Sequence, residues 1–175
     1  MTTRSRAMNI FEAAATSGNY GDVAVIPLEV DPQITLSRNS VTQPFYMVYD
    51  HDTVLAQMSG SSRLRLRESS VLYFDSVVGD HTYIPAGTPH RIEPQVEGVL
   101  VRYSTNEENE RGALFVCDAC GADLHRVEWT HDHDVEPVRI YAAISGQFNA
   151  DDKLRTCSCG HVNAPVPVEL LGWTV

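Results

Sequence analysis

Short runs of alternating apolar and polar residues fill the chain from Asp22 to Val101. They predict strands, because successive side chains of a strand point to opposite faces of a sheet. Turn residues interrupt the runs every few positions, and many short strands at this spacing indicate a closed or sandwiched all-β fold. The predicted strands are Val23–Ile26, Ile34–Ser37, Phe45–Tyr49, Val54–Met58, Arg63–Arg67, Val71–Phe74, Thr82–Ile84 and Gly98–Tyr103.

Residues 1–21 are predicted to form an N-terminal extension with one short helix, Asn9–Ser17. Asn9 can cap this helix, the alanines that follow favour it, and Gly18 ends it.

One strand shows its two faces clearly. Arg63, Arg65 and Arg67 share one face, and the two leucines between them share the other. The simpler interpretation is a solvated outer face above a leucine-lined core. The alternative is a patch that attracts anions to the mouth of a barrel.

The stretch Gly79–His90 combines a predicted strand, a tight Pro85-Ala86-Gly87 turn and a histidine. It resembles the second sequence motif of the cupin barrels, in which this histidine points into a small β-barrel and binds a metal. The resemblance implies a single-domain cupin (jelly-roll) barrel over residues 22–106, with His90 facing inward.

A polar, acidic linker at residues 104–111 precedes residues 112–165, which differ in character. We therefore expect a four-cysteine segment with a tail over residues 107–175, which begins within this linker. Cys117-Asp-Ala-Cys120-Gly121 opens this segment, and Cys157-Ser-Cys159-Gly160 closes its cysteine region. A helix is predicted around Val138–Ser145.

Two close cysteine pairs that lie far apart in sequence can surround one tetrahedral metal ion. Zinc is the usual occupant, and iron is possible with four sulfur ligands. The glycine after each pair lets the turn fold back. We predict a closed structural site formed by Cys117, Cys120, Cys157 and Cys159, whose metal would help to fold a segment with little core of its own.

Three alternatives remain in this segment. The second cysteine spacing is one residue shorter than is common, which makes His161 a reserve ligand. The cysteines can also be two unrelated reduced pairs. His131 and His133 can bind metal from a strand, although their acidic surroundings favour solvated surface.

Composition narrows the classes of function. The chain has 175 residues and a formal net charge of −10, which argues against a nucleic-acid surface. No apolar run approaches the roughly 20 residues of a membrane span, and the paired cysteines suggest metal before disulfides. We therefore expect a cytoplasmic protein.

The cysteine region resembles that of bacterial 3-hydroxyanthranilate 3,4-dioxygenase, a cupin barrel followed by a rubredoxin-like metal site. The residues that carry this likeness are the first cysteine pair, Leu124–Glu128, Phe148–Ala150, and Arg155-Thr156 before the second pair. In the barrel, Gln57-Met58-Ser59-Gly60 is similar to the strand end of that family.

The family holds a catalytic iron(II) with two histidines and a glutamate, and cleaves an aromatic ring with molecular oxygen. By this resemblance the second histidine falls on His90, the first on Met47 and the glutamate on Thr53. Neither of the last two can replace the expected ligand well. The two substrate arginines of the family would fall on Gln43 and close to Pro94, and its active-site glutamate close to Arg102.

A rebuilt site would need inward ligands from neighbouring positions. His51 faces inward if its strand continues, but Asp50-His51-Asp52 also reads as a polar turn. Gln57 and His81 face inward if their strands present those faces to the cavity. Arg38 and Arg102 can supply a guanidinium for a carboxylate, or can be charged strand ends in water.

Two functions are therefore expected. The first is a metal-dependent, dioxygenase-like enzyme with His90 and His51 as catalytic residues, acting on a small aromatic or amino acid-like acid. Possible iron(II) in the barrel would supply its chemistry. The second is a non-catalytic cupin that binds a small acid through Arg38, Gln57 and Arg102, with only a structural zinc or iron at the cysteines. In both cases we expect a homodimer.

Overall fold

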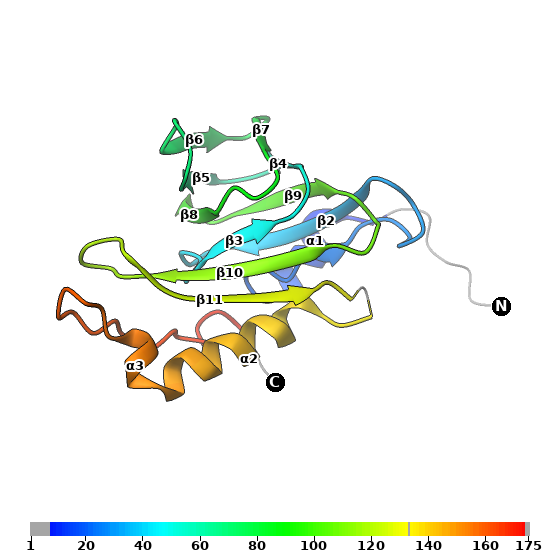
Figure 1. Ribbon diagram of the computed structural model, residues 1–175. Coiled ribbons are helices and arrows are strands. Elements are labelled where there is room, and N and C mark those ends of the chain that lie inside the picture. The colour runs from blue at the N-terminus through cyan, green and yellow to red at the C-terminus, as the bar shows by residue number, and fades with distance from the viewer. Residues whose placement is uncertain (1–7, 133, 174–175) are drawn as a thin grey trace.

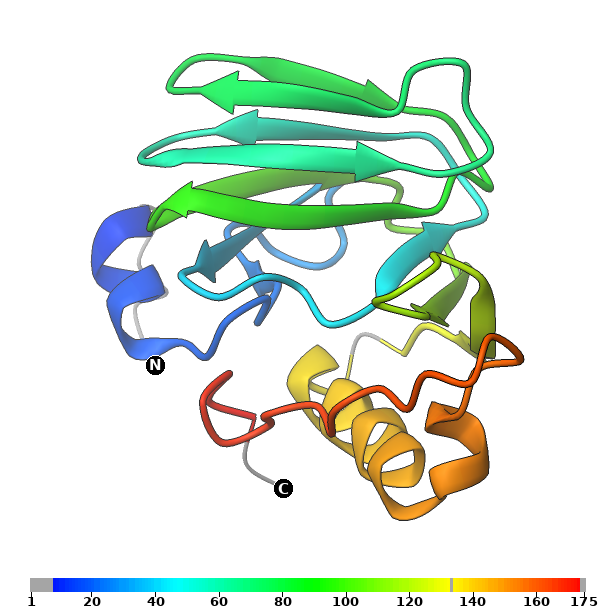
Figure 2. The ribbon, with the colours of Figure 1, turned by 90° about the vertical axis from the view of Figure 1, so that its left-hand side faces the viewer.

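Two antiparallel sheets face each other in the computed structural model, which describes residues 8–132 and 134–173 (Figures 1 and 2). The five-stranded sheet has the order β1-β2-β9-β4-β7, and the six-stranded sheet has the order β11-β10-β3-β8-β5-β6. The strands are β1 Val23–Ala24, β2 Gln33–Asn39, β3 Tyr46–Tyr49, β4 Thr53–Gln57, β5 Ser61–Leu66, β6 Tyr73–Val77, β7 His81–Ile84, β8 His90–Val96, β9 Gly98–Ser104, β10 Glu110–Val116 and β11 Asp123–Thr130. The cupin-type all-β fold predicted from the sequence is confirmed.

The main core lies between the inner faces of the sheets. Its members come from both sheets and include Leu55, Leu64 and Leu100. On β5 the arginines point outward, where Arg63 pairs with Asp75 and Arg65 pairs with Glu93. These carboxylates neutralise the arginine row, which supports the interpretation as a solvated outer face.

The helices α1, α2 and α3 complete the fold of the described residues. Helix α1 (Ile10–Thr16) is capped by the Asn9 side chain, as predicted, and packs on the outer face of the five-stranded sheet near Leu36. Helix α2 (Pro137–Ala150) lies beside β10 and β11 (Figure 1), where Phe148 stacks on Phe115 with ring centroids 4.1 Å apart. Helix α3 (Asp152–Arg155) leads to the second cysteine pair.

Strands β8, β10 and β11 were not predicted from the sequence. Strand β8 carries Arg91, Glu93 and Pro94, which hide its apolar alternation, and β10 begins inside the predicted linker. The linker is therefore shorter than expected, since β9 extends to Ser104 and β10 starts at Glu110.

The predicted boundary between residues 106 and 107 falls in the connection between β9 and β10. The segment after it is built into the barrel, because β10 pairs with β3 on one side and with β11 on the other. No helix among the described residues is long and apolar enough to cross a membrane.

Candidate functional site

The four cysteines converge at one point although about 40 residues separate the two pairs. Sulfur atoms of Cys117 and Cys159 are 3.7 Å apart, and those of Cys120 and Cys157 are 3.6 Å apart. A tetrahedral ion with metal–sulfur bonds of about 2.3 Å places its ligands about 3.8 Å from one another. The cluster therefore has the dimensions of a four-thiolate metal site.

Backbone turns position these sulfurs. Gly121 and Gly160 both adopt positive φ, 74° and 90°, so each chain folds back behind its pair as predicted. Asn163 joins the two turns, because its Nδ2 donates to the Val116 carbonyl and its Oδ1 accepts from the Asp118 amide. The Cys159 amide donates to the Cys157 sulfur and is the main cause that lowers the pKa of Cys157 to about 6. This donation favours the thiolate that a metal requires.

The shorter second spacing does not displace Cys157, whose sulfur lies within the cluster. His161 is exposed, and its backbone carbonyl accepts from the Cys157 amide. His131 follows β11 in a loop and is buried, while its predicted partner His133 lies outside the described residues.

In the barrel, His90 begins β8 and faces inward with no exposed surface. Its Nδ1 lies 3.1 Å from the Thr88 carbonyl, which can only accept, so Nδ1 carries the ring hydrogen. Burial, followed by the nearby Arg102 charge, lowers the pKa of His90 to about 3. The imidazole is therefore neutral, with its lone pair on Nε2.

Arg102 of β9 occupies the space in front of that lone pair. Its Nη2 donates to His90 Nε2 at 3.0 Å, and its Nη1 donates to Thr53 Oγ1 at 3.0 Å. The guanidinium carbon also lies 4.4 Å above the Tyr49 ring, which stacks on His90. Met47 is the cross-strand partner of His90.

These residues do not fit the iron(II) site that the resemblance implies. The positions expected to hold two histidines and a glutamate do come together, but they carry His90, a thioether and a hydroxyl. The single imidazole lone pair already accepts a hydrogen bond from a cation. Thioether and neutral hydroxyl groups are poor ligands for iron(II) beside a fixed positive charge.

His51, the other predicted catalytic residue, lies in the turn between β3 and β4. Its Nδ1 is 2.8 Å from Asp50 Oδ1, and its ring meets the edge of Tyr49. The carboxylates of Asp50 and Asp52, in the same turn, accept hydrogen bonds from the backbone amides of Glu110 and Ala86, respectively. Among the described residues, no metal-binding group joins His51 to His90.

The three predicted substrate residues lie apart. Arg38 points to the outer surface and pairs with Glu97. Gln57 is buried, and its side chain bonds to Ser59 and Ser62. Only Arg102 reaches the barrel interior beside His90, and His81 is exposed on β7.

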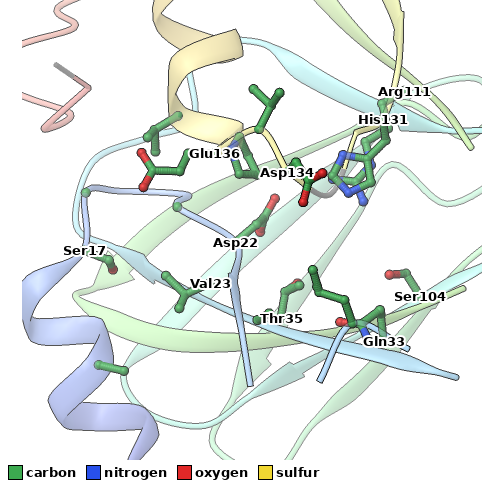
Figure 3. Close-up of a pocket in the computed structure, with 18 of the residues that line it drawn as sticks. Ser17, Asp22, Val23, Gln33, Thr35, Ser104, Arg111, His131, Asp134 and Glu136 are labelled. Carbon is green, nitrogen blue, oxygen red and sulfur yellow. The ribbon is translucent and has the colours of Figure 1, made fainter. Parts of the chain in front are cut away.

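A cavity of about 570 Å³ lies between α1, β1, β2 and the start of α2 (Figure 3). Its polar wall includes Asp22, Gln33, Ser104, Arg111 and His131. Gln33 is almost fully buried, and its amide nitrogen donates to two backbone carbonyls. Its Oε1 has no hydrogen-bond partner among the described residues and can accept a donor from a bound molecule.

Arg111 is the guanidinium of this wall, which also carries the carboxylates of Asp22, Asp134 and Glu136, and only 6% of its surface is exposed. Its Nε donates to Asn109, and its guanidinium lies 4.9 Å from the centre of the Tyr49 ring. No carboxylate of the described residues forms an ion pair with it. Tyr49 thus contacts two buried guanidinium groups, those of Arg102 and Arg111.

Asp22 of the cavity wall is hydrogen-bonded to the buried Tyr141. The buried Tyr141 hydroxyl donates to Asp22 Oδ2 at 3.0 Å, and burial, followed by the Asp22 charge, raises its pKa well above the usual value.

The sequence did not identify Arg111 and Gln33 as cavity residues, or Tyr49 as the ring that contacts Arg111. The alternation Arg111-x-Ala113-x-Phe115 places Arg111 on the inner face of β10, but the acidic residues before it suggested a linker. Nothing in the local sequence marks Gln33, because its environment is created by the loop before β2.

Comparison with known proteins agrees with the resemblance seen in the sequence. The chain is 29% identical over 99 residues to 3-hydroxyanthranilate 3,4-dioxygenase of Bacillus cereus. The match covers 54% of this chain and 51% of that enzyme, so the chain spans about half the length of the curated relative that it matches. A comparison with models of protein families gives no match.

Comparison with solved structures bears on the fold. Hydroquinone 1,2-dioxygenase from Sphingomonas sp. TTNP3, with 4-hydroxybenzoate bound, matches with a TM-score of 0.50 and 18% identity over 55% of this chain and 72% of that chain. The hydroquinone 1,2-dioxygenase PnpCD, in complex with Cd²⁺ and 4-hydroxybenzonitrile, matches with a TM-score of 0.49 and 23% identity, covering 55% and 71% of the two chains. At these identities the likeness concerns the fold alone.

Proposed function

We propose that this protein is a cupin that binds a small organic acid in the cavity lined by Arg111 and Gln33, without ring-cleaving chemistry. The observation that carries the proposal is the buried guanidinium of Arg111, which lines the cavity and has no carboxylate partner among the described residues. Buried charges in proteins are normally paired, so an anionic ligand would complete this site.

The size of the cavity supports the proposal. A volume of about 570 Å³ falls within the range of roughly 300–1,000 Å³ that is typical of small-molecule sites. Apolar lining residues such as Val23 and Val138 suit a hydrocarbon or aromatic body, and Arg111 suits its carboxylate.

Calorimetric titration with benzoate tests this function, with benzamide as the uncharged probe. Wild-type protein is expected to bind benzoate more tightly than benzamide. Arg111→Gln keeps a polar side chain of similar size but removes the charge, and should weaken benzoate binding about tenfold or more.

Arg38→Gln is the matched control, because it removes an exposed arginine that pairs with Glu97 on the outer surface. It should leave the affinity unchanged. Equal benzoate affinity in wild type and Arg111→Gln, or the absence of benzoate binding in wild type, would contradict the proposed site.

A metal-dependent dioxygenase acting on a small aromatic or amino acid-like acid is the second candidate. The partial sequence similarity to 3-hydroxyanthranilate 3,4-dioxygenase favours it. It would use His90 and His51 as catalytic residues. Anaerobic loading with iron(II), followed by oxygen uptake with hydroxylated aminobenzoates, tests it. Uptake that exceeds the level in His90→Ala would support the enzyme and contradict simple binding.

The cysteine site is proposed to hold zinc or iron in a structural role, because its four sulfurs already have metal-site spacing. Reduced thiolates suit the cytoplasm, where we propose that the protein acts. We also propose a homodimer, with the exposed apolar edge near β6 as its contact surface.

A further inference from the structure

Four inward side chains meet where the resemblance would place a metal ion. Met47 and His90 are cross-strand neighbours on β3 and β8, and Arg102 of β9 bridges His90 to Thr53 of β4. Each of the four has an exposed fraction of 6% or less. The barrel therefore has a buried, polar centre of defined composition.

The centre already contains a positive charge. His90 can offer a metal only its Nε2 lone pair, since Nδ1 donates to Thr88, and Arg102 Nη2 takes that lone pair at 3.0 Å. The other guanidinium contacts are the Thr53 hydroxyl and the face of Tyr49. All three partners are neutral groups that donate electron density to a cation.

We propose that Arg102 takes the place of a metal ion in this barrel. Its guanidinium uses the imidazole lone pair that a metal would use, and its charge repels a divalent cation from the same space. The fold thereby keeps a cation at its centre that cannot be chelated and has no redox chemistry. The proposal rests on contacts of Arg102 and does not depend on acid binding through Arg111.

Cobalt(II) is a suitable probe, because bonds to thiolates give charge-transfer absorption and bonds to nitrogen and oxygen alone do not. Apoprotein loaded with Co²⁺ and freed of excess ion should retain one equivalent, with thiolate absorption. His90→Ala should retain the same equivalent, and the double variant Cys117→Ser/Cys120→Ser should lose it. A second equivalent in wild type that disappears in His90→Ala would overturn the proposal.

A reconstructed site tests the part played by Arg102 itself. The triple variant Met47→His/Thr53→Glu/Arg102→Ser supplies two new ligands beside His90 and removes the guanidinium. It should bind a second equivalent of Co²⁺ without additional thiolate absorption. The matched variant Met47→His/Thr53→Glu has the same ligands but retains Arg102, and it should stay at one equivalent.

The cysteine-bound cobalt reports that the chain has folded in each variant that keeps all four cysteines. Equal cobalt content in Met47→His/Thr53→Glu and in Met47→His/Thr53→Glu/Arg102→Ser would contradict exclusion by Arg102, whether both bind one equivalent or both bind two. Benzoate binding can fail in wild type while these metal contents hold, so the outcomes of the two proposals are distinguishable.

Discussion

At the scale of single residues, the barrel centre is governed by hydrogen-bond direction. His90 is fully buried, and its two hydrogen bonds favour the neutral ring. Its Nδ1–H donates to the Thr88 carbonyl, and its Nε2 accepts from Arg102. A protonated imidazole would place two cations in contact inside the core. Burial, with the Arg102 charge adding to it, accordingly lowers the pKa of His90 to about 3.

This lowered pKa predicts an acid-sensitive fold. Unfolded His90 takes up a proton below pH about 6.5, whereas folded His90 stays neutral down to pH about 3. The contribution of His90 to stability is therefore present above pH 6.5 and is lost as the pH falls, at up to about 1.4 kcal/mol per pH unit. Chemical unfolding between pH 7 and pH 4 measures this slope.

His90→Gln should make the dependence of the unfolding free energy on pH shallower, by the uptake of about one proton on unfolding, since glutamine does not titrate. The acidic groups and the cysteine site contribute equally to both proteins. Identical slopes for the two would show that His90 is protonated in the folded state over this range.

At the scale of elements, α2 closes the inner face of the wider sheet. Strands β10 and β11 extend the six-stranded sheet beyond β3, and the inward Phe115 would meet water without a cover. Phe148 and Tyr141 of α2 supply that cover, together with Trp173 from the C-terminal segment. The helix therefore belongs to the main core.

Phe148→Ala tests this docking. Removing a buried aromatic ring leaves a cavity and should lower the free energy of unfolding by about 3–5 kcal/mol. Arg139→Ala changes an exposed position of the same helix and should cost less than about 0.5 kcal/mol. Denaturant unfolding of both variants measures the difference, and similar losses would mean that α2 does not pack as described.

At the scale of the whole molecule, the cysteine cluster ties the end of β10 to the chain beyond α3. Arg67 from the end of β5 adds a link, since it donates to the Gly121 carbonyl and to Asp123. The cluster thus joins the barrel to the last part of the chain, and a bound metal would stabilise that connection.

Metal removal should lower the melting temperature of the protein. Chelator treatment of metal-loaded wild type and the Cys120→Ser substitution are expected to have similar effects, because both remove the four-ligand site. Chelator should then have little further effect on Cys120→Ser. His161→Ala is the control and should melt like wild type; an equal fall in this variant would make His161 a ligand.

The proposed homodimer makes its own prediction. Strand β6 is the edge of its sheet, and Leu72, Val77 and Val78 beside it are 58–68% exposed. Unpaired apolar edges readily pair with another chain. Light scattering should give a dimer mass for wild type and a monomer mass for Val77→Lys/Val78→Lys. A monomeric wild type would contradict the prediction.

How much could be inferred from the sequence depends on how local the determining forces are. Alternation in residues such as Arg63–Arg67 predicts a strand and its faces, and the cysteine pairs with their glycines predict a metal cluster, because both patterns act over a few neighbours. The Gly79–His90 stretch likewise predicts an inward histidine. The strand with its two faces, the convergence of the four cysteines and the inward His90 are present in the structure as expected.

Only the tertiary structure decided what surrounds that histidine. Met47 and Thr53 lie on strands far before His90 in the chain, Arg102 lies 12 residues after it, and pairing between strands brings all three to His90. Arg111 likewise lies beside Tyr49 because β10 pairs with β3. Residue types along the chain determined the barrel and the four-cysteine cluster. Strand pairing decided which charge occupies the centre of the barrel, because buried electrostatics depend on distances that sequence order does not contain.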